Sequence, residues 1–203
     1  YERLSHVVVP GRGLCPVDDK ALQASGLSLG ELSVIADAVS TPYQAVLRSG
    51  LVRGDVAVFI GAGGVGGFGV QIAAALGAHV IAIDIDEARL ASIADHGAAW
   101  TLCSRDKDPQ VIRKAVAEHV KAQGWSPYTW KIFETSGHPR GQETAFGLLT
   151  FGAHLSVVGY TLEKVHTNTL ARALATRTPA AHRLAVALWK RASGEDLADC
   201  SIL

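Results

Sequence analysis

The sequence predicts an α/β fold, in which helices cover both faces of a parallel sheet. Three observations predict it. Short apolar runs alternate with helical segments from Asp55 to Tyr160, a glycine cluster (FIGAGGVGGFG) follows the first run directly, and Asp84 ends the second run. Alternation of strands and helices at these lengths is typical of a parallel sheet. Each glycine in regular structure costs about 0.5–1 kcal/mol relative to alanine, so the cluster indicates a turn that something must approach closely.

The segment before this alternation predicts one short strand and two helices. The stretch SHVVVPGRGL reads as a strand that Pro10 and Gly11 interrupt. Ser28 is a candidate N-cap, because Glu31 follows it at the spacing of a capping box, and Gly50 ends the second helix.

Five strands and four helices are expected in the alternating part. The strands are predicted at residues 55–60, 79–84, 98–103, 130–135 and 153–160, and the helices at residues 66–76, 86–97, 109–123 and 142–150. Right-handed crossovers then give the strand order 3-2-1-4-5. After Val165 the pattern stops, and the remaining residues predict a helix near residues 180–192 but no sixth strand.

The glycine cluster contains the spacing G-x-G-x-x-G at Gly61, Gly63 and Gly66. After a strand and at the start of a helix, this pattern indicates a doubly wound Rossmann fold in which a pyrophosphate lies against backbone N–H groups. Asp84 follows Gly66 by 18 residues, near the ~20 expected for an acid that binds the ribose 2′-hydroxyl. The alternative is a tight structural turn and a solvated aspartate.

The carboxylate of Asp84 also favours NAD over NADP, because it would repel a 2′-phosphate. The next basic residue is Arg89, and its side chain could swing toward such a phosphate.

Composition excludes several classes of function. Among 203 residues there are 19 Lys and Arg and 19 Asp and Glu, with no basic run, so neither a nucleic-acid partner nor a membrane surface is expected. The three cysteines, Cys15, Cys103 and Cys200, lack paired spacing and predict reduced thiols in a cytoplasmic protein. The histidines occur singly, and the tryptophans are too scattered for a stacking platform. Because the sequence has no methionine and begins at Tyr1, we interpret it as a piece of a longer protein.

The stretch ADAVSTPYQAVLRSGLVRGDVAVFIGAGGVGGFGVQIAAALGAHVIAID resembles the junction and first half of the cofactor domain of medium-chain, zinc-dependent alcohol dehydrogenases. More narrowly, the longer stretch from SHVVVPGRGLCPV through KIFETSGHPRGQETAFGLLTFGAHLSVVGYTLEKV resembles 6-hydroxycyclohex-1-ene-1-carbonyl-CoA dehydrogenases, which act in the anaerobic breakdown of benzoyl-CoA. The similarity is clearest in ADAVSTPYQA and in FETSGHPRGQETAFGLL. The resemblance covers about residues 5 to 165.

This resemblance implies roles for individual residues. The adenosine ribose would meet Asp84 and Arg89, and Asp37 stands where the family has its third catalytic zinc ligand, a helix-terminal capping role being the alternative. The pyrophosphate would lie on Gly61, Gly63, Gly64, Val65 and Gly66, and the nicotinamide side would meet Thr41, Thr135, Gly159 and Tyr160.

The resemblance also implies a division of the chain. Residues 1–29 would be a remnant of the N-terminal, GroES-like catalytic domain, residues 30–165 the NAD-binding domain, and residues 166–203 an atypical tail. The other zinc ligands of the family would belong to the catalytic domain, so this chain alone is expected to bind little zinc and to be inactive.

The expected function is NAD-dependent oxidation of a cyclic hydroxyacyl-CoA to the ketone, with zinc in the complete enzyme polarising the alcohol. A homo-oligomer is possible, and no catalytic residue is assigned. Two alternatives stay open: a non-catalytic NAD-binding remnant, and a protein similar to zinc-free enoyl or quinone reductases. The latter normally prefer NADPH, which Asp84 disfavours.

Overall fold

The structure is a computed structural model that describes residues 8–161. The chain divides into two compact units, whose junction lies between Ala36 and Asp37. The predictions for residues 1–7 and for the tail from residue 166 lie outside the described residues. Within the described residues, no helix is both long and apolar enough to cross a membrane.

The first unit consists of short helices. Ser28 and Glu31 form the predicted capping box, in which each side chain accepts a hydrogen bond from the other's backbone N–H. The strand expected around Val8 and Val9 is absent, since both residues lie in neither helix nor strand. The elements are η1 (Gly11–Gly13), α1 (Asp19–Ser25), α2 (Leu29–Leu32) and η2 (Ser33–Ala36).

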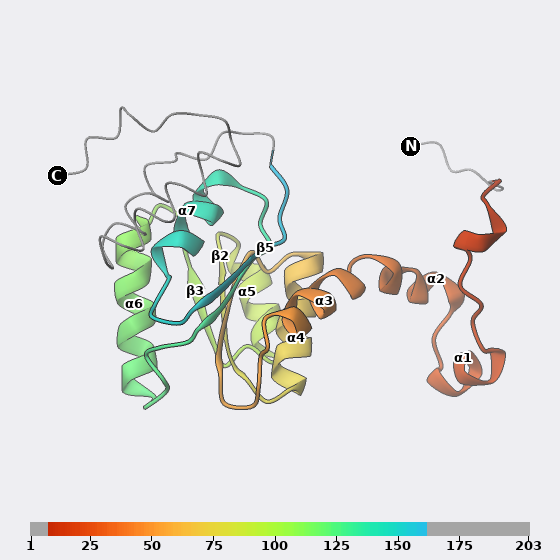
Figure 1. The fold of residues 1–203 in the computed structure, drawn as a ribbon, viewed down its shortest axis with the longest axis horizontal. Coiled ribbons are helices and arrows are strands. Elements are labelled where there is room, and N and C mark those ends of the chain that lie inside the picture. Colours follow the sequence, from red (N-terminus) through yellow and green to blue (C-terminus); the bar gives the residue numbers. More distant parts are fainter. Residues whose placement is uncertain (1–7, 162–203) are drawn as a thin grey trace. The chain divides into compact units, whose positions relative to one another are not determined.

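The second unit is a five-stranded parallel sheet with helices on both faces (Figure 1). Its strand order, β3-β2-β1-β4-β5, confirms the predicted order. The strands are β1 (Val56–Ile60), β2 (His79–Asp84), β3 (Trp100–Cys103), β4 (Lys131–Glu134) and β5 (His154–Val157). The helices are α3 (Ser40–Arg48), α4 (Gly64–Ala75), α5 (Glu87–Ala94), α6 (Pro109–Ala122) and α7 (Pro139–Gly147).

Alternate residues of β1 pack into two separate hydrophobic cores, one on each face of the sheet. Ala57 and Phe59 pack with residues of α3, α4 and α5 on one face of the sheet. Val56, Val58 and Ile60 pack with α6 and α7 on the other. All five β1 residues are buried, which explains why the strand reads as a continuous apolar run.

Two helices begin earlier than the sequence analysis expected. Helix α4 begins at Gly64 instead of residue 66, and α7 begins at Pro139 instead of residue 142. The α7 start follows from local chemistry, because His138 accepts a hydrogen bond from Arg140 N–H and Pro139 occupies the first turn.

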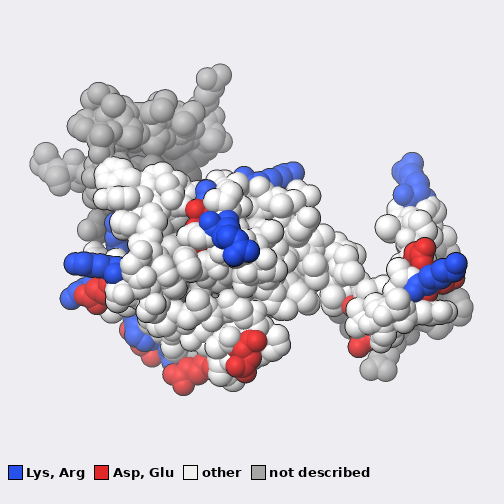
Figure 2. Space-filling view, turned by 90° about the horizontal axis from the view of Figure 1, so that it is seen from below, with Lys and Arg blue, Asp and Glu red and all other residues white. Residues whose placement is uncertain are grey.

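Charged side chains of both signs are interspersed over the face shown in Figure 2, with no broad field of either sign. This distribution agrees with the balanced composition of 19 basic and 19 acidic residues.

Aromatic rings gather where β2 and β3 begin. His79 stacks on Trp125 with ring centroids 4.4 Å apart, and His119 stacks on Trp100 at 4.2 Å. His119 also meets Trp125 edge to face at 5.4 Å, so it joins the two pairs. Trp100 and Trp125 therefore lie near each other through His119, whereas the absence of a tryptophan stacking platform for a ligand stays a prediction. Tertiary structure unites residues that are far apart in sequence.

The contact between α4 and β1 predicts a stability difference between two glycines of the same helix. A Cβ at Gly69 would overlap the buried ring of Phe59, whereas a Cβ at Gly67 would have only ordinary contacts, the nearest 3.6 Å from Ala62 O. Gly69→Ala should therefore lower the free energy of unfolding by about 1–3 kcal/mol. Gly67→Ala should leave it unchanged or raise it by up to ~1 kcal/mol through helix propensity. Urea unfolding measures both, and equal stabilities would contradict this packing.

The stacked imidazole of His119 predicts a dependence of stability on pH. Burial lowers the pKa of His119 below its ordinary value of 6.5, and its Nε2 has no hydrogen-bond partner among the described residues. Below about pH 6.5 His119 takes up a proton in the unfolded chain more readily than in the folded chain. The free energy of unfolding therefore decreases as the pH is lowered. His119→Phe keeps an aromatic ring there, and it should lose less stability than the unmutated chain between about pH 7 and pH 5. Identical losses in urea unfolding would refute this.

Candidate functional site

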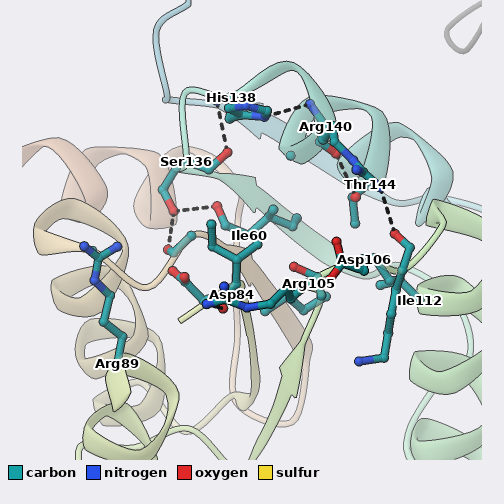
Figure 3. Close-up of a pocket in the computed structure, with 18 residues that line it drawn as sticks. Ile60, Asp84, Arg89, Arg105, Asp106, Ile112, Ser136, His138, Arg140 and Thr144 are labelled. Carbon is teal, nitrogen blue, oxygen red and sulfur yellow. Dashed lines mark hydrogen bonds between the residues drawn. The ribbon is translucent and has the colours of Figure 1, made fainter. Parts of the chain in front are cut away.

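A cavity of about 500 Å³ lies at the carboxyl ends of the parallel strands. Its wall includes the ends of β1 and β2, the loop after β3, the turn after β4 and the start of α7 (Figure 3). Ligands of open α/β sheets bind at this edge, where strand order reverses between β1 and β4. Five of the predicted site residues line it: Gly61, Gly63, Asp84, Arg89 and Thr135.

The glycine-rich turn between β1 and α4 is tightly packed at two glycines. Gly61 has φ +97°, and a Cβ there would lie 2.8 Å from the backbone of Ser136. A Cβ at Gly66 would overlap Gly61 O and lie 2.6 Å from Thr135 Oγ1. Helix α4 can therefore approach the ends of β1 and β4 closely only because these positions lack side chains.

Gly63 and Gly64 differ from these two, because a Cβ at either would meet nothing within 4 Å. Gly63 is the N-cap of α4 and provides no side-chain cap. The first N–H groups of the helix, which include those of Val65 and Gly66, therefore have no intrahelical or side-chain acceptor. An anionic ligand can reach these N–H groups and the positive end of the helix dipole.

Asp84 ends β2 and is held by backbone donors. Its Oδ2 accepts from Ala62 N at 2.6 Å, and its Oδ1 accepts from Asp86 N at 2.9 Å. The residue is 7% exposed yet lines the cavity. The carboxylate is thus oriented, and the remaining lone pairs of its oxygens can accept a ligand hydroxyl.

Thr135 links the turn to β4. Its hydroxyl lies within hydrogen-bond distance of two carbonyl oxygens, Gly61 O at 2.8 Å and Ile60 O at 3.0 Å. Thr135 was predicted to line the nicotinamide side. The structure places it in the cavity wall, with its hydroxyl directed toward the glycine-rich turn.

The buried carboxylate of Glu134 organises the turn after β4. Its Oε1 accepts from the N–H and hydroxyl of Ser136 and from Gly137 N, whereas its Oε2 has no partner among the described residues. Gly159 lies against this group, and its N–H donates to Glu134 O at 2.9 Å. Tyr160 is 80% exposed. Gly159 and Tyr160 thus adjoin the β4 turn but do not line the cavity.

Thr41 and Asp37 lie outside the cavity wall and contact each other. Thr41 Oγ1 donates to Asp37 Oδ1 at 2.8 Å, and Thr41 N donates to Asp37 O at 2.9 Å. The part of the chain that the structure describes contains no group of three or more His, Cys, Asp or Glu that could hold a metal. These residues alone therefore do not build a zinc site. The role of Asp37 as a ligand stays a prediction.

The sequence predicted Arg89, but three other basic side chains of the cavity wall were missed. Arg105 and Lys107 come from the loop after β3, and Arg140 comes from α7. Arg105 donates to Ile85 O at 2.8 Å, and Arg140 donates to Lys107 O at 3.4 Å. Their positions after strand ends were a signal that could have found them.

Known dehydrogenases are similar to this chain in sequence. Residues 64–186 match a family described as zinc-binding dehydrogenase. The chain is also similar to an alcohol dehydrogenase of Moraxella sp. (strain TAE123), with 35% identity over 79 residues, which are 39% of this chain and 23% of that protein.

Two solved structures share the fold. Galactitol-1-phosphate dehydrogenase from Escherichia coli has a TM-score of 0.63 and 23% identity, covering 83% of this chain and 51% of that one. A zinc-binding dehydrogenase from Sinorhizobium meliloti 1021, bound to NADP, has a TM-score of 0.58 and 20% identity, covering 68% and 41%. The chain thus spans about half the length of these structures, or less.

Proposed function

The chain belongs to the zinc-binding dehydrogenase family, and from this premise we propose that its cavity binds NAD for the oxidation of an alcohol to a ketone. The observation that carries the proposal is the open start of α4. A Cβ at Gly63 or Gly64 would meet nothing within 4 Å. The space beside these two glycines is therefore open to a pyrophosphate. A Cβ at Gly61 or Gly66 would instead collide with neighbouring backbone atoms.

The residues of the cavity fit the parts of NAD. The pyrophosphate would accept hydrogen bonds from N–H groups of the first turn of α4, including those of Val65 and Gly66. The ribose hydroxyl would donate to Asp84, whose orientation Ala62 and Asp86 fix. Because that carboxylate repels a 2′-phosphate, we propose that NAD binds more tightly than NADP.

Bound NAD would accept a hydride from the alcohol carbon of the substrate. The chain's own contribution is to fix the position of the dinucleotide. Thr135 and Glu134 hold the turns after β1 and β4, whose ends form the cavity wall. The described residues do not form a zinc site by themselves, and we propose zinc for the complete enzyme only.

The proposed substrate class is a cyclic hydroxyacyl-CoA. Its support is the resemblance of ADAVSTPYQA, residues 36–45, and of the stretch after β4 to dehydrogenases of that class. The same proposal includes a cytoplasmic protein that acts in the degradation of aromatic compounds, without nucleic-acid or membrane partners and as a homo-oligomer.

A non-catalytic NAD-binding module is the second candidate, because the described residues bring no metal ligands together. Detection of a catalytic zinc in the purified complete protein would exclude it. A zinc-free enoyl or quinone reductase is disfavoured by the oriented carboxylate of Asp84.

The test is titration calorimetry of the chain with NAD and with NADP. NAD should bind more tightly, and Gly63→Val should weaken binding at least tenfold, because its branched side chain fills the space proposed for the pyrophosphate. The melting temperature should stay close to that of the parent, since Gly63 has φ −71° and open surroundings.

Gly67→Ala is the matched control. It changes a glycine of the same helix whose Cβ would have only ordinary contacts, so it should bind NAD normally. Unaltered NAD binding by Gly63→Val would show that the glycine-rich turn is structural only.

A further inference from the structure

The wall of the cavity is more basic than the chain as a whole. Among residues 8–161, four Lys or Arg and two aspartates line it, whereas the whole sequence has 19 residues of each sign. The positive end of α4 would bind the pyrophosphate. That role does not explain the basic side chains of the wall, because they come from other elements. They are Arg89 from α5, Arg105 and Lys107 from the loop after β3, and Arg140 from α7.

Arg105 is the basic residue held beside the end of β2. Its guanidinium donates to the carbonyl of Ile85, the residue directly after Asp84, at 2.8 Å. Arg105 and Asp84 both belong to the cavity wall drawn in Figure 3. Among the described residues it forms no ion pair, whereas Arg89 pairs with Asp86 at 3.6 Å. Arg105 therefore brings a positive charge, which no described residue holds in an ion pair, to the end of β2, where the adenosine ribose would lie on Asp84.

We propose that Arg105 determines cofactor specificity by supporting a phosphate on the 2′-position of that ribose. The inference rests on the proposed binding of a dinucleotide. Asp84 repels such a phosphate, but Arg105 attracts it and offsets part of the repulsion. The cavity therefore accepts NADP as well as NAD, with only a narrow preference for NAD.

The chemistry of the guanidinium suits this role. An arginine has five N–H donors in a planar fork. Among the described residues Arg105 uses one of them in its hydrogen bond to Ile85 O, which leaves donors for a phosphate oxygen. Charge-assisted bonds to phosphate are stronger than neutral ones. A ribose hydroxyl carries no charge, so NAD gains much less from Arg105 than NADP does.

The experiment is calorimetric titration of the chain and two variants with NAD and NADP. The unmutated chain should bind NADP no more than about tenfold more weakly than NAD. Arg105→Gln should weaken NADP binding by about a further tenfold, the loss of one charge-assisted hydrogen bond, and change NAD binding less than about twofold. Arg105→Lys keeps the charge and should retain most of the NADP binding.

Lys114→Gln is the control for net charge, because Lys114 is an exposed residue of α6 that pairs with Glu118 at 3.9 Å and is not part of the cavity wall. It should alter neither affinity. Adenosine 2′,5′-bisphosphate and 5′-AMP, titrated into the unmutated chain, isolate the contribution of the extra phosphate and require no variant.

Each failure has a distinct signature. Binding of neither dinucleotide would overturn the proposed function, and this inference with it. NAD binding with a hundredfold or greater penalty for NADP, or for the bisphosphate relative to 5′-AMP, would overturn the inference alone. Equal weakening of NAD and NADP by Arg105→Gln would also overturn it, because Arg105 would then contact a part that both cofactors share.

Discussion

The close approach of α4 to the ends of β1 and β4 is the constraint on which the site depends. A Cβ at Gly66 would overlap Gly61 O and lie 2.6 Å from Thr135 Oγ1, so any side chain there would push the helix away from the sheet. Because the helix can lie so close, its first N–H groups point into the edge of the sheet where the strands end. Side chains at these glycines would prevent that approach, and we propose that a bound anion uses the N–H groups left open by it.

Hydrogen bonds around this approach hold the crevice in shape. Asp84 binds Ala62 N of the turn, and Thr135 binds the carbonyl of Gly61, so β2 and β4 both support the same short segment. The buried carboxylate of Glu134 fixes the next turn in a similar way. A ligand would thus meet groups that are positioned before it binds, which reduces the ordering cost of binding.

Local pattern was sufficient to predict the sheet, its order and the glycine-rich turn. The run at residues 79–84 coincides with β2, and the spacing of Gly61, Gly63 and Gly66 lies where expected. The partners of Arg105 and the aromatic group around His119 were not predictable, because they depend on which loops and strand ends meet in space. The start of α7 was missed because a histidine, His138, serves as its cap, a role that sequence rules assign to other residues.

Binding of the pyrophosphate at the start of α4 is tested most directly by nuclear magnetic resonance of the ¹⁵N-labelled chain during a titration with NAD. We expect the largest amide shifts at Gly63 to Gly66, with further shifts at the end of β2. The amides near His119, at the opposite end of the strands, should not move. Shifts confined to other regions, with the amides of the glycine-rich turn unchanged at saturation, would contradict the claim that the start of α4 holds the pyrophosphate.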